Sequence, residues 1–117
     1  MHVRLSGLAL GLLLLVALAS PAAAAPVSVD LRLEGKTATH FEGPVSVDVR
    51  TVDGHDGSGA HTCDGGAASP TAGGALATAS ETAPFAWKGT WFQSFSDFSV
   101  DTINGETPDF NADATFW

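Results

Sequence analysis

The sequence is poor in cysteine and in basic residues. Cys63 is the one cysteine among 117 residues, so no disulfide can close within the chain. Five Lys and Arg stand against 13 Asp and Glu, which gives a formal net charge of −8 at pH 7. A chain this acidic is repelled by nucleic acid and by anionic lipid. The composition therefore excludes proteins that bind nucleic acid through their charge, and we expect no nucleic-acid partner.

Long apolar runs are also scarce, and the one that is present lies near the N-terminus. Arg4 precedes the run Leu8–Ala19, and a small-residue segment follows it. As a helix the run would be about 18 Å long, against roughly 30 Å of hydrocarbon in a bilayer. This pattern predicts that residues 1–25 are a signal peptide cleaved after Ala25, and a cut after Ala24 fits almost as well. We therefore expect a secreted or cell-surface protein with no membrane span after cleavage.

Two stretches of alternating apolar and polar residues organise the rest of the chain. They are Val27–Leu33 and Val45–Arg50. Because successive side chains of a strand point to opposite faces, each stretch has one apolar and one polar face. Two such segments close together in the sequence predict antiparallel neighbours in one sheet. Between them we expect a short strand over Thr37–Glu42, ended by Gly43 and Pro44.

The second half of the chain changes character twice. Asp53–Gly74 is rich in Gly, Ala, Ser and Asp, which predicts a loop of about twenty residues. Gly74–Ala83 predicts a short helix that Pro84 stops. Phe85–Val100 carries four of the seven Phe and two of the three Trp. The expected fold class is α+β and mainly β: one domain over residues 26–117 with a small antiparallel or mixed sheet, one short helix and a long Gly/Ala-rich loop.

The end of the sequence is unusual for a domain. Phe116 and Trp117 are large aromatic residues, whereas domains normally end on polar, surface residues. A single unpaired cysteine is also unusual in an exported protein of this size. From these two features we expect that the sequence is a fragment and that the final strands of the domain are missing.

Several short motifs, taken in order, resemble a known family. They are VSVDLRLEG at 27–35, FEGPV at 41–45, HTCDGG at 61–66, ASPTAGGALATA at 68–79 and FAWKGTWFQSFSDFSVDTING at 85–105. Together they are similar to the small secreted bacterial domains called transcobalamin-like C-terminal domains, formerly a domain of unknown function. The resemblance covers nearly all of residues 26–117.

The resemblance implies a small β-rich domain with one helix. In such domains the segment matching Phe116 and Trp117 is followed by a glycine and a final pair of strands that carries a second cysteine. Cys63 would form a disulfide with that cysteine, which would lie beyond Trp117. Relatives within the animal cobalamin carriers use the domain to cap bound cobalamin. Bacterial relatives have no settled activity, so we assign no cofactor and leave the ligand open.

Polar residues that could carry chemistry gather in the predicted loop. They are His55, Asp56, His61, Cys63 and Asp64. Imidazole, thiolate and carboxylate are suitable metal ligands, but the spacing matches no standard metal motif, so we expect no metal site. Ser58 stands between glycines near the histidines, and a flexible loop does not hold a nucleophile against its base. Asp97 and Asp101 could pair as acid and base, although solvated carboxylates explain them better, so we expect no catalytic residue.

The aromatic segment offers the one candidate for ligand contact. Trp87 and Trp91, with the phenylalanines that follow, could form a stacking platform for a small molecule or a glycan. Aromatic residues of a small domain more often fill its core. We expect mostly core packing, with Trp87 or Trp91 free to line a groove.

These observations lead to three hypotheses about function. The first is an exported, non-enzymatic binding or interaction domain that takes an unknown small molecule, or a protein or glycan at a cell surface. The second is a structural cell-surface module without a small-molecule ligand. The third, which the sequence favours least, is a secreted hydrolase that uses the His, Asp and Ser residues of the loop.

Overall fold

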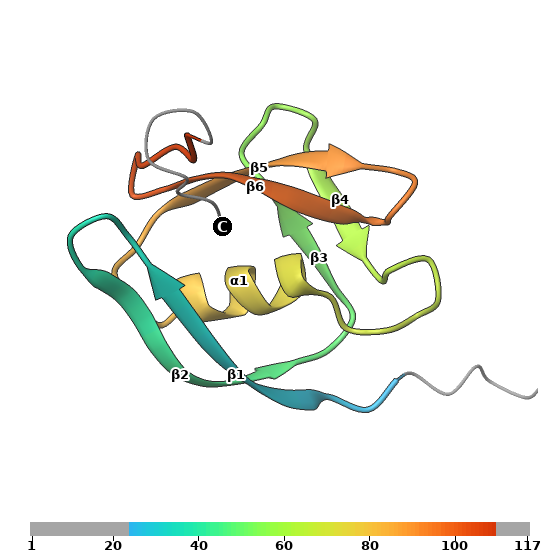
Figure 1. Cartoon of the computed structure of the whole chain (residues 1–117). Coiled ribbons are helices and arrows are strands. Elements are labelled where there is room, and N and C mark those ends of the chain that lie inside the picture. The colour runs from blue at the N-terminus through green and yellow to red at the C-terminus, as the bar shows by residue number, and fades with distance from the viewer. Residues whose placement is uncertain (1–23, 110–117) are drawn as a thin grey trace, which may run out of the picture.

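The computed structural model describes residues 24–109, in which three two-stranded antiparallel sheets surround one helix (Figure 1). The predicted signal peptide up to residue 23 and the aromatic pair Phe116 and Trp117 lie outside the described residues. The elements in chain order are β1 (Val27–Glu34), β2 (Thr39–Val47), β3 (Arg50–Asp53), β4 (Ala60–Cys63), α1 (Ala72–Ser80), β5 (Trp87–Phe92) and β6 (Asp97–Ile103). The mainly β class with one short helix is therefore confirmed.

The first hairpin pairs Val27–Leu33 with the start of the second alternating stretch, as predicted, but that stretch does not stay in one strand: β2 ends at Val47 and Arg50 begins β3. β1 and β2 pair antiparallel, with Val27 opposite Val47 and Leu33 opposite Phe41. The prediction that Gly43 and Pro44 end a separate strand is wrong, because β2 runs through both residues to Val47. Pro44 sits opposite Asp30 without interrupting the register, and the chain leaves the strand only after Val47.

The apolar face of this hairpin is buried on one strand more than on the other. Val45 and Val47 of β2 are 5% and 1% exposed, whereas Val27 and Val29 of β1 are 47% and 37% exposed. Leu31 and Leu33 are partly buried against the core. The described residues therefore leave the first half of β1 uncovered on its apolar side.

The long Gly/Ala-rich loop predicted over Asp53–Gly74 is interrupted by a strand. β4 pairs antiparallel with β3, with Arg50 opposite Cys63. The aspartates before and after β4 make tight turns, because Asp56 Oδ1 accepts the backbone N–H of Ser58 and Asp64 Oδ1 accepts that of Gly66, both at 2.8 Å. Residues predicted to be a flexible loop thus form a hairpin closed by side-chain hydrogen bonds.

Helix α1 begins two residues earlier than the predicted Gly74. Thr71 is its N-cap, and the Thr71 hydroxyl accepts the Gly74 N–H at 3.1 Å. Asp97 of β6 also accepts the N–H of Gly73 at 3.2 Å, which ties the helix start to the third hairpin. The buried side of the helix carries Leu76, 3% exposed, among small alanines. The small side chains let strands pack closely on several sides of one helix.

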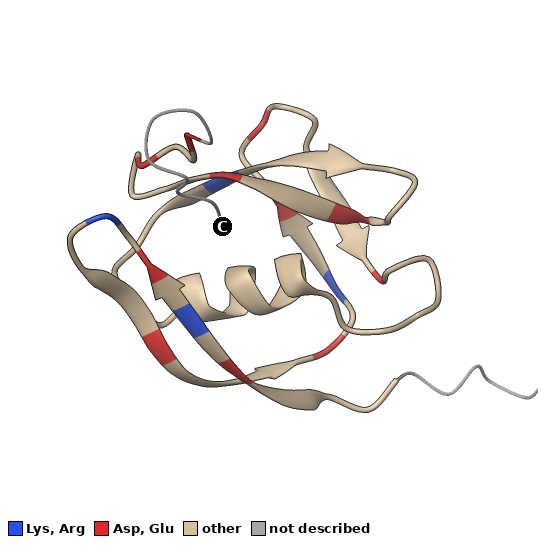
Figure 2. Ribbon diagram, in the orientation of Figure 1, with Lys and Arg blue, Asp and Glu red and all other residues tan. Residues whose placement is uncertain are grey.

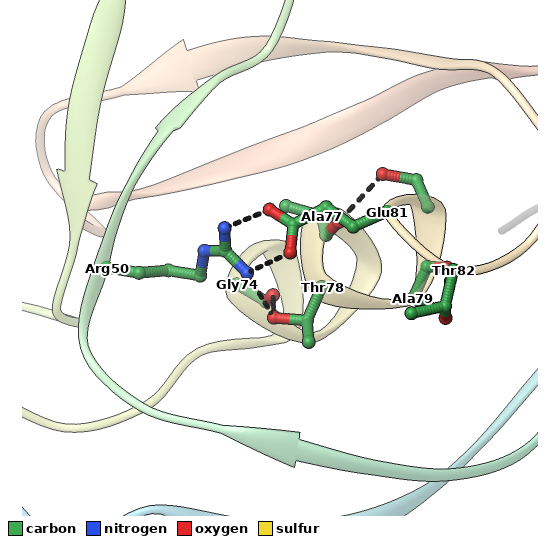
Figure 3. Close-up of polar contacts among 8 residues, drawn as sticks. Arg50, Gly74, Ala77, Thr78, Ala79, Glu81 and Thr82 are labelled. Carbon is green, nitrogen blue, oxygen red and sulfur yellow. Dashed lines mark hydrogen bonds and ion pairs between the residues drawn. The ribbon is translucent and has the colours of Figure 1, made fainter.

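A salt bridge fixes the other side of α1 to β3 (Figure 3). The Arg50 guanidinium donates to the Thr78 hydroxyl at 2.6 Å and to both carboxylate oxygens of Glu81. The Arg50 side chain is 25% exposed and that of Glu81 is 57% exposed. The contact therefore joins two elements at the edge of the core.

The third hairpin completes the core. β5 and β6 pair antiparallel, and Trp87, Phe98 and Ile103 are buried at 5%, 7% and 0% exposure. The second hairpin reaches this one through the Gly89 N–H, which donates to the Gly54 carbonyl at 2.8 Å. In residues 24–109 no helix has the length and apolar character needed to cross a membrane.

Candidate functional site

A groove is lined by residues of β1, α1 and β6. Figure 1 shows how these three elements are arranged. Its walls come from apolar side chains of both strands, and Leu76 of α1 lies at its base. This part of the groove has a volume of about 620 Å³. The apolar lining side chains are Leu31, Leu33, Leu76, Phe98, Val100 and Ile103.

The groove continues along β1 toward its N-terminal end. A second hollow, also of about 620 Å³, is lined by Val27 and Val29 and by the start of α1. Leu31 and Ala72 line both hollows, so the two are adjacent along the strand. The two hollows together border β1 from Val27 to Glu34.

Charged side chains border the two hollows. Asp30 contributes to the second hollow, and Arg32 and Glu34 contribute to the first. Arg32 pairs with Glu34 and, at 3.8 Å, with Glu42, and all three side chains are more than half exposed. No charged or polar residue among those described is fully buried. The arrangement suits a guest with an apolar interior face and polar ends.

The two predicted ligand-contact tryptophans lie behind the groove wall. Trp87 is buried, and its ring meets Phe98 edge-on with centroids 5.9 Å apart. Trp91 stacks on His61 at 4.4 Å and meets the same Phe98 ring at 5.0 Å. The prediction that aromatics mainly fill the core is confirmed for Trp87 and Phe98. Phe98 lines the groove, so a guest bound there would contact the Phe98 ring. That ring in turn contacts the indoles of Trp87 and Trp91.

Two other phenylalanines form a separate surface. Phe92 and Phe95 are 43% and 68% exposed, with ring centroids 6.3 Å apart. They line a hollow of about 300 Å³ together with Asp97, Phe98 and Ser99. The hollow at this aromatic face has about half the volume of either part of the groove.

The loop residues considered for hydrolysis do come together. The Ser58 hydroxyl donates to Asp56 Oδ1 at 2.6 Å and lies 3.0 Å from His61 Nε2. The tautomer of His61 decides whether its Nε2 donates to or accepts from the serine hydroxyl. Hydrogen bonds from Ser58, and then from the Trp91 backbone, lower the pKa of Asp56 from 3.8 to about 2. The Ser58 backbone and hydroxyl thus both bind the Asp56 carboxylate within the turn.

The residues considered as metal ligands do not converge. No three His, Cys, Asp or Glu side chains within residues 24–109 are placed to hold a metal ion. Cys63 is fully buried, whereas its strand neighbour His61 stacks on Trp91. Burial, and then the nearby Asp97 carboxylate, raise the pKa of the Cys63 thiol from 9.0 to about 11. Its predicted disulfide stays a prediction, as does cleavage after Ala25.

The two β6 aspartates have structural partners. Asp97 accepts the Thr71 hydroxyl at 2.9 Å and a helix N–H, so it anchors the start of α1. Asp101 accepts the Thr90 hydroxyl across the hairpin at 2.7 Å. Both carboxylates thus hold neighbouring elements together.

The sequence analysis missed the groove residues on β1, α1 and β6. The alternation of Val27–Leu33 indicated an apolar face, but it did not show what would cover that face.

No family model, curated protein or solved structure matches this chain. The likeness to transcobalamin-like C-terminal domains therefore rests on the sequence motifs alone.

Proposed function

We propose that this chain is an exported, non-enzymatic binding domain whose groove between β1 and β6 takes an apolar guest. The observation that carries the proposal is the pair of adjacent, mainly apolar hollows between β1 and α1. Val27 and Val29 keep 47% and 37% of their surface exposed in a domain with few large apolar residues. Apolar surface gathered in a concave site is typical of a binding site.

The geometry of the loop supports a non-enzymatic role. A serine nucleophile needs a base that accepts its proton. The Ser58 hydroxyl instead donates a hydrogen bond to Asp56, which also accepts the Trp91 N–H at 3.0 Å. The cluster of Asp56, Ser58 and His61 therefore closes a turn and anchors it to β5.

A structural surface module is the second candidate function, and the exposed pair Phe92 and Phe95 favours it. A neighbouring domain could cover this aromatic face without any small molecule. The face and the groove are lined by different residues except for Phe98. Substitutions at the two places therefore separate the two functions.

Binding of the neutral dye Nile red tests the proposed function. We expect its fluorescence to rise with the native protein and with Ser28→Lys, and to stay low with Val29→Lys. Both variants add one lysine to β1, but Ser28 and Val29 lie on opposite faces of the strand. Equal dye binding by all three proteins would overturn the groove as the site. Loss of binding in Phe95→Ala, with binding kept in Val29→Lys, would favour the aromatic face.

A further inference from the structure

The turn between β3 and β4 is joined to β5 by a cluster of polar and aromatic contacts. Figure 2 shows acidic residues at the end of β3 and in the turn that follows it. In this turn the Ser58 hydroxyl donates to Asp56 Oδ1 at 2.6 Å, and Asp56 Oδ2 accepts the Trp91 N–H at 3.0 Å. His61 Nε2 lies 3.0 Å from the Ser58 oxygen. The His61 ring stacks on the Trp91 indole, with centroids 4.4 Å apart and an angle of 5° between the ring planes. The second hairpin therefore contacts Trp91 twice, at its backbone and at its ring.

The groups that face His61 from β3 and β6 are apolar. β3 places Val52 opposite His61 in the register of the hairpin. β6 presents the Phe98 ring, whose centroid is 6.1 Å from that of the imidazole. The turn also carries Asp53 and His55, whose side chains pair with each other at 3.8 Å and are more than half exposed. Because water screens an exposed pair, the polar cluster determines how His61 responds to a proton.

A proton on His61 would strengthen both of its contacts in this cluster. A charged imidazole carries an N–H on each nitrogen, so Nε2 donates to the Ser58 oxygen whichever tautomer the neutral ring adopts. The Ser58 hydroxyl in turn donates to a carboxylate that stays charged in acid, because hydrogen bonds from Ser58, and then from the Trp91 backbone, lower the pKa of Asp56 to about 2. A cation on the face of an indole also gains a cation–π attraction. Both contacts therefore change in the same direction.

We propose that the cluster of Asp56, Ser58, His61 and Trp91 is a pH-sensitive clasp, in which a proton on His61 tightens the second hairpin against the third. Histidine is the side chain that gains its charge between about pH 8 and about pH 5. Because the folded cluster holds the protonated ring better, the stabilisation grows as the pH falls through this range and is lost as the pH rises. The clasp ends beside the groove, since the Trp91 ring meets Phe98 at 5.0 Å and Phe98 lines the groove. It does not depend on what fills the groove.

Thermal melts of matched variants test the clasp. The measured quantity is the melting temperature at about pH 5 minus that at about pH 8. This difference should be more positive for the native protein than for His61→Gln by about 4–8 °C, because glutamine forms hydrogen bonds but gains no proton. His55→Gln is the control, since His55 also lies near a tryptophan and an aspartate but is 61% exposed. Its pH response should stay within about 2 °C of the native one.

Two further variants and a fluorescence titration locate the effect of the proton. Trp91→Leu removes the indole and Ser58→Ala removes the hydroxyl, and each should reduce the pH response because one of the two contacts of His61 is lost. A protonated imidazole quenches the fluorescence of an indole on which it stacks. Tryptophan emission of the folded protein should therefore fall from about pH 8 to about pH 5 in the native protein and in His55→Gln, and stay constant in His61→Gln.

Several results would overturn the clasp. One is an equal pH response of the native protein and His61→Gln. Another is a native protein that loses more stability in acid than His61→Gln does, which would mean that the folded cluster excludes the proton. A response that persists in full in both Trp91→Leu and Ser58→Ala would place the effect of the proton outside the cluster. Constant tryptophan emission in His55→Gln, which keeps His61, would refute the clasp even if His61→Gln does not fold.

Discussion

Replacing Arg50 with methionine tests how α1 is held in place as the floor of the groove. Methionine keeps the aliphatic stem, which packs near Gly74, and removes the guanidinium. Exposed ion pairs contribute about 0.2–1 kcal/mol, and a hydrogen bond from a charged donor about 1.5–3 kcal/mol. The Glu81 side chain is 57% exposed, so its share is small, while the bond to Thr78 is partly buried. We therefore expect Arg50→Met to lower the free energy of unfolding by about 1.5–3 kcal/mol.

Arg32→Met is the matched control for this prediction. Arg32 also pairs with a glutamate, but its side chain is 58% exposed and its partners lie on the same hairpin. Its loss should lower the free energy of unfolding by less than about 1 kcal/mol. Urea denaturation followed by circular dichroism measures both variants. If Arg50→Met stayed within about 0.5 kcal/mol of the native protein, or if Arg32→Met cost as much, the assigned role of the Arg50 contact would be wrong.

Three further predictions concern the core and two titrating groups. A Cβ at Gly54 would lie 2.4 Å from Phe98 Cε1 and 2.6 Å from a backbone oxygen. Gly54→Ala should therefore lower the free energy of unfolding, measured by urea denaturation, by at least about 1–3 kcal/mol. An unchanged free energy of unfolding would contradict this close packing. Because the pKa of Asp56 is lowered to about 2, its contribution to stability is present above pH 3.8 and is lost as the pH falls through 2, and Asp56→Asn should flatten acid unfolding there. Because the pKa of Cys63 is raised to about 11, the contribution of its protonated thiol to the stability of the fold is present below pH 9.0 and is lost as the pH rises through 11. A thiol reagent at pH 8 should label Cys63 only after denaturation, and rapid labelling of the folded protein would refute its burial.

The first hairpin could be predicted because its signal is local. Val27–Leu33 and Val45–Val47 alternate with a period of two, and only one register buries the valines of the second stretch. The strand through Gly43 and Pro44 could not be predicted, because the sheet tolerates a proline where a neighbour does not need its N–H. Strand β4 was missed because Ala60–Cys63 contains no large apolar residue to mark it.

The candidate site could not be predicted because its parts are distant in the sequence. Leu31 and Ile103 face the same groove from opposite ends of the described chain. The early start of α1 depends on a similarly distant contact: a Cβ at Gly73 would lie 2.3 Å from Asp97 Oδ1. In the aromatic segment Trp87 and Phe98 belong to the core as predicted, whereas Phe92 and Phe95 are exposed. The contact of Phe98 with the groove depends on tertiary packing.

Methyl NMR tests most directly whether the groove is the binding site. The side chains would be ¹³C-labelled, and Nile red would be titrated into the purified protein. The account predicts shifts of the Leu31, Leu76 and Ile103 methyl signals, while Val45 and Val52, which are buried outside the groove lining, stay in place. Unchanged groove methyls at saturating dye would contradict it, because the dye would then bind elsewhere.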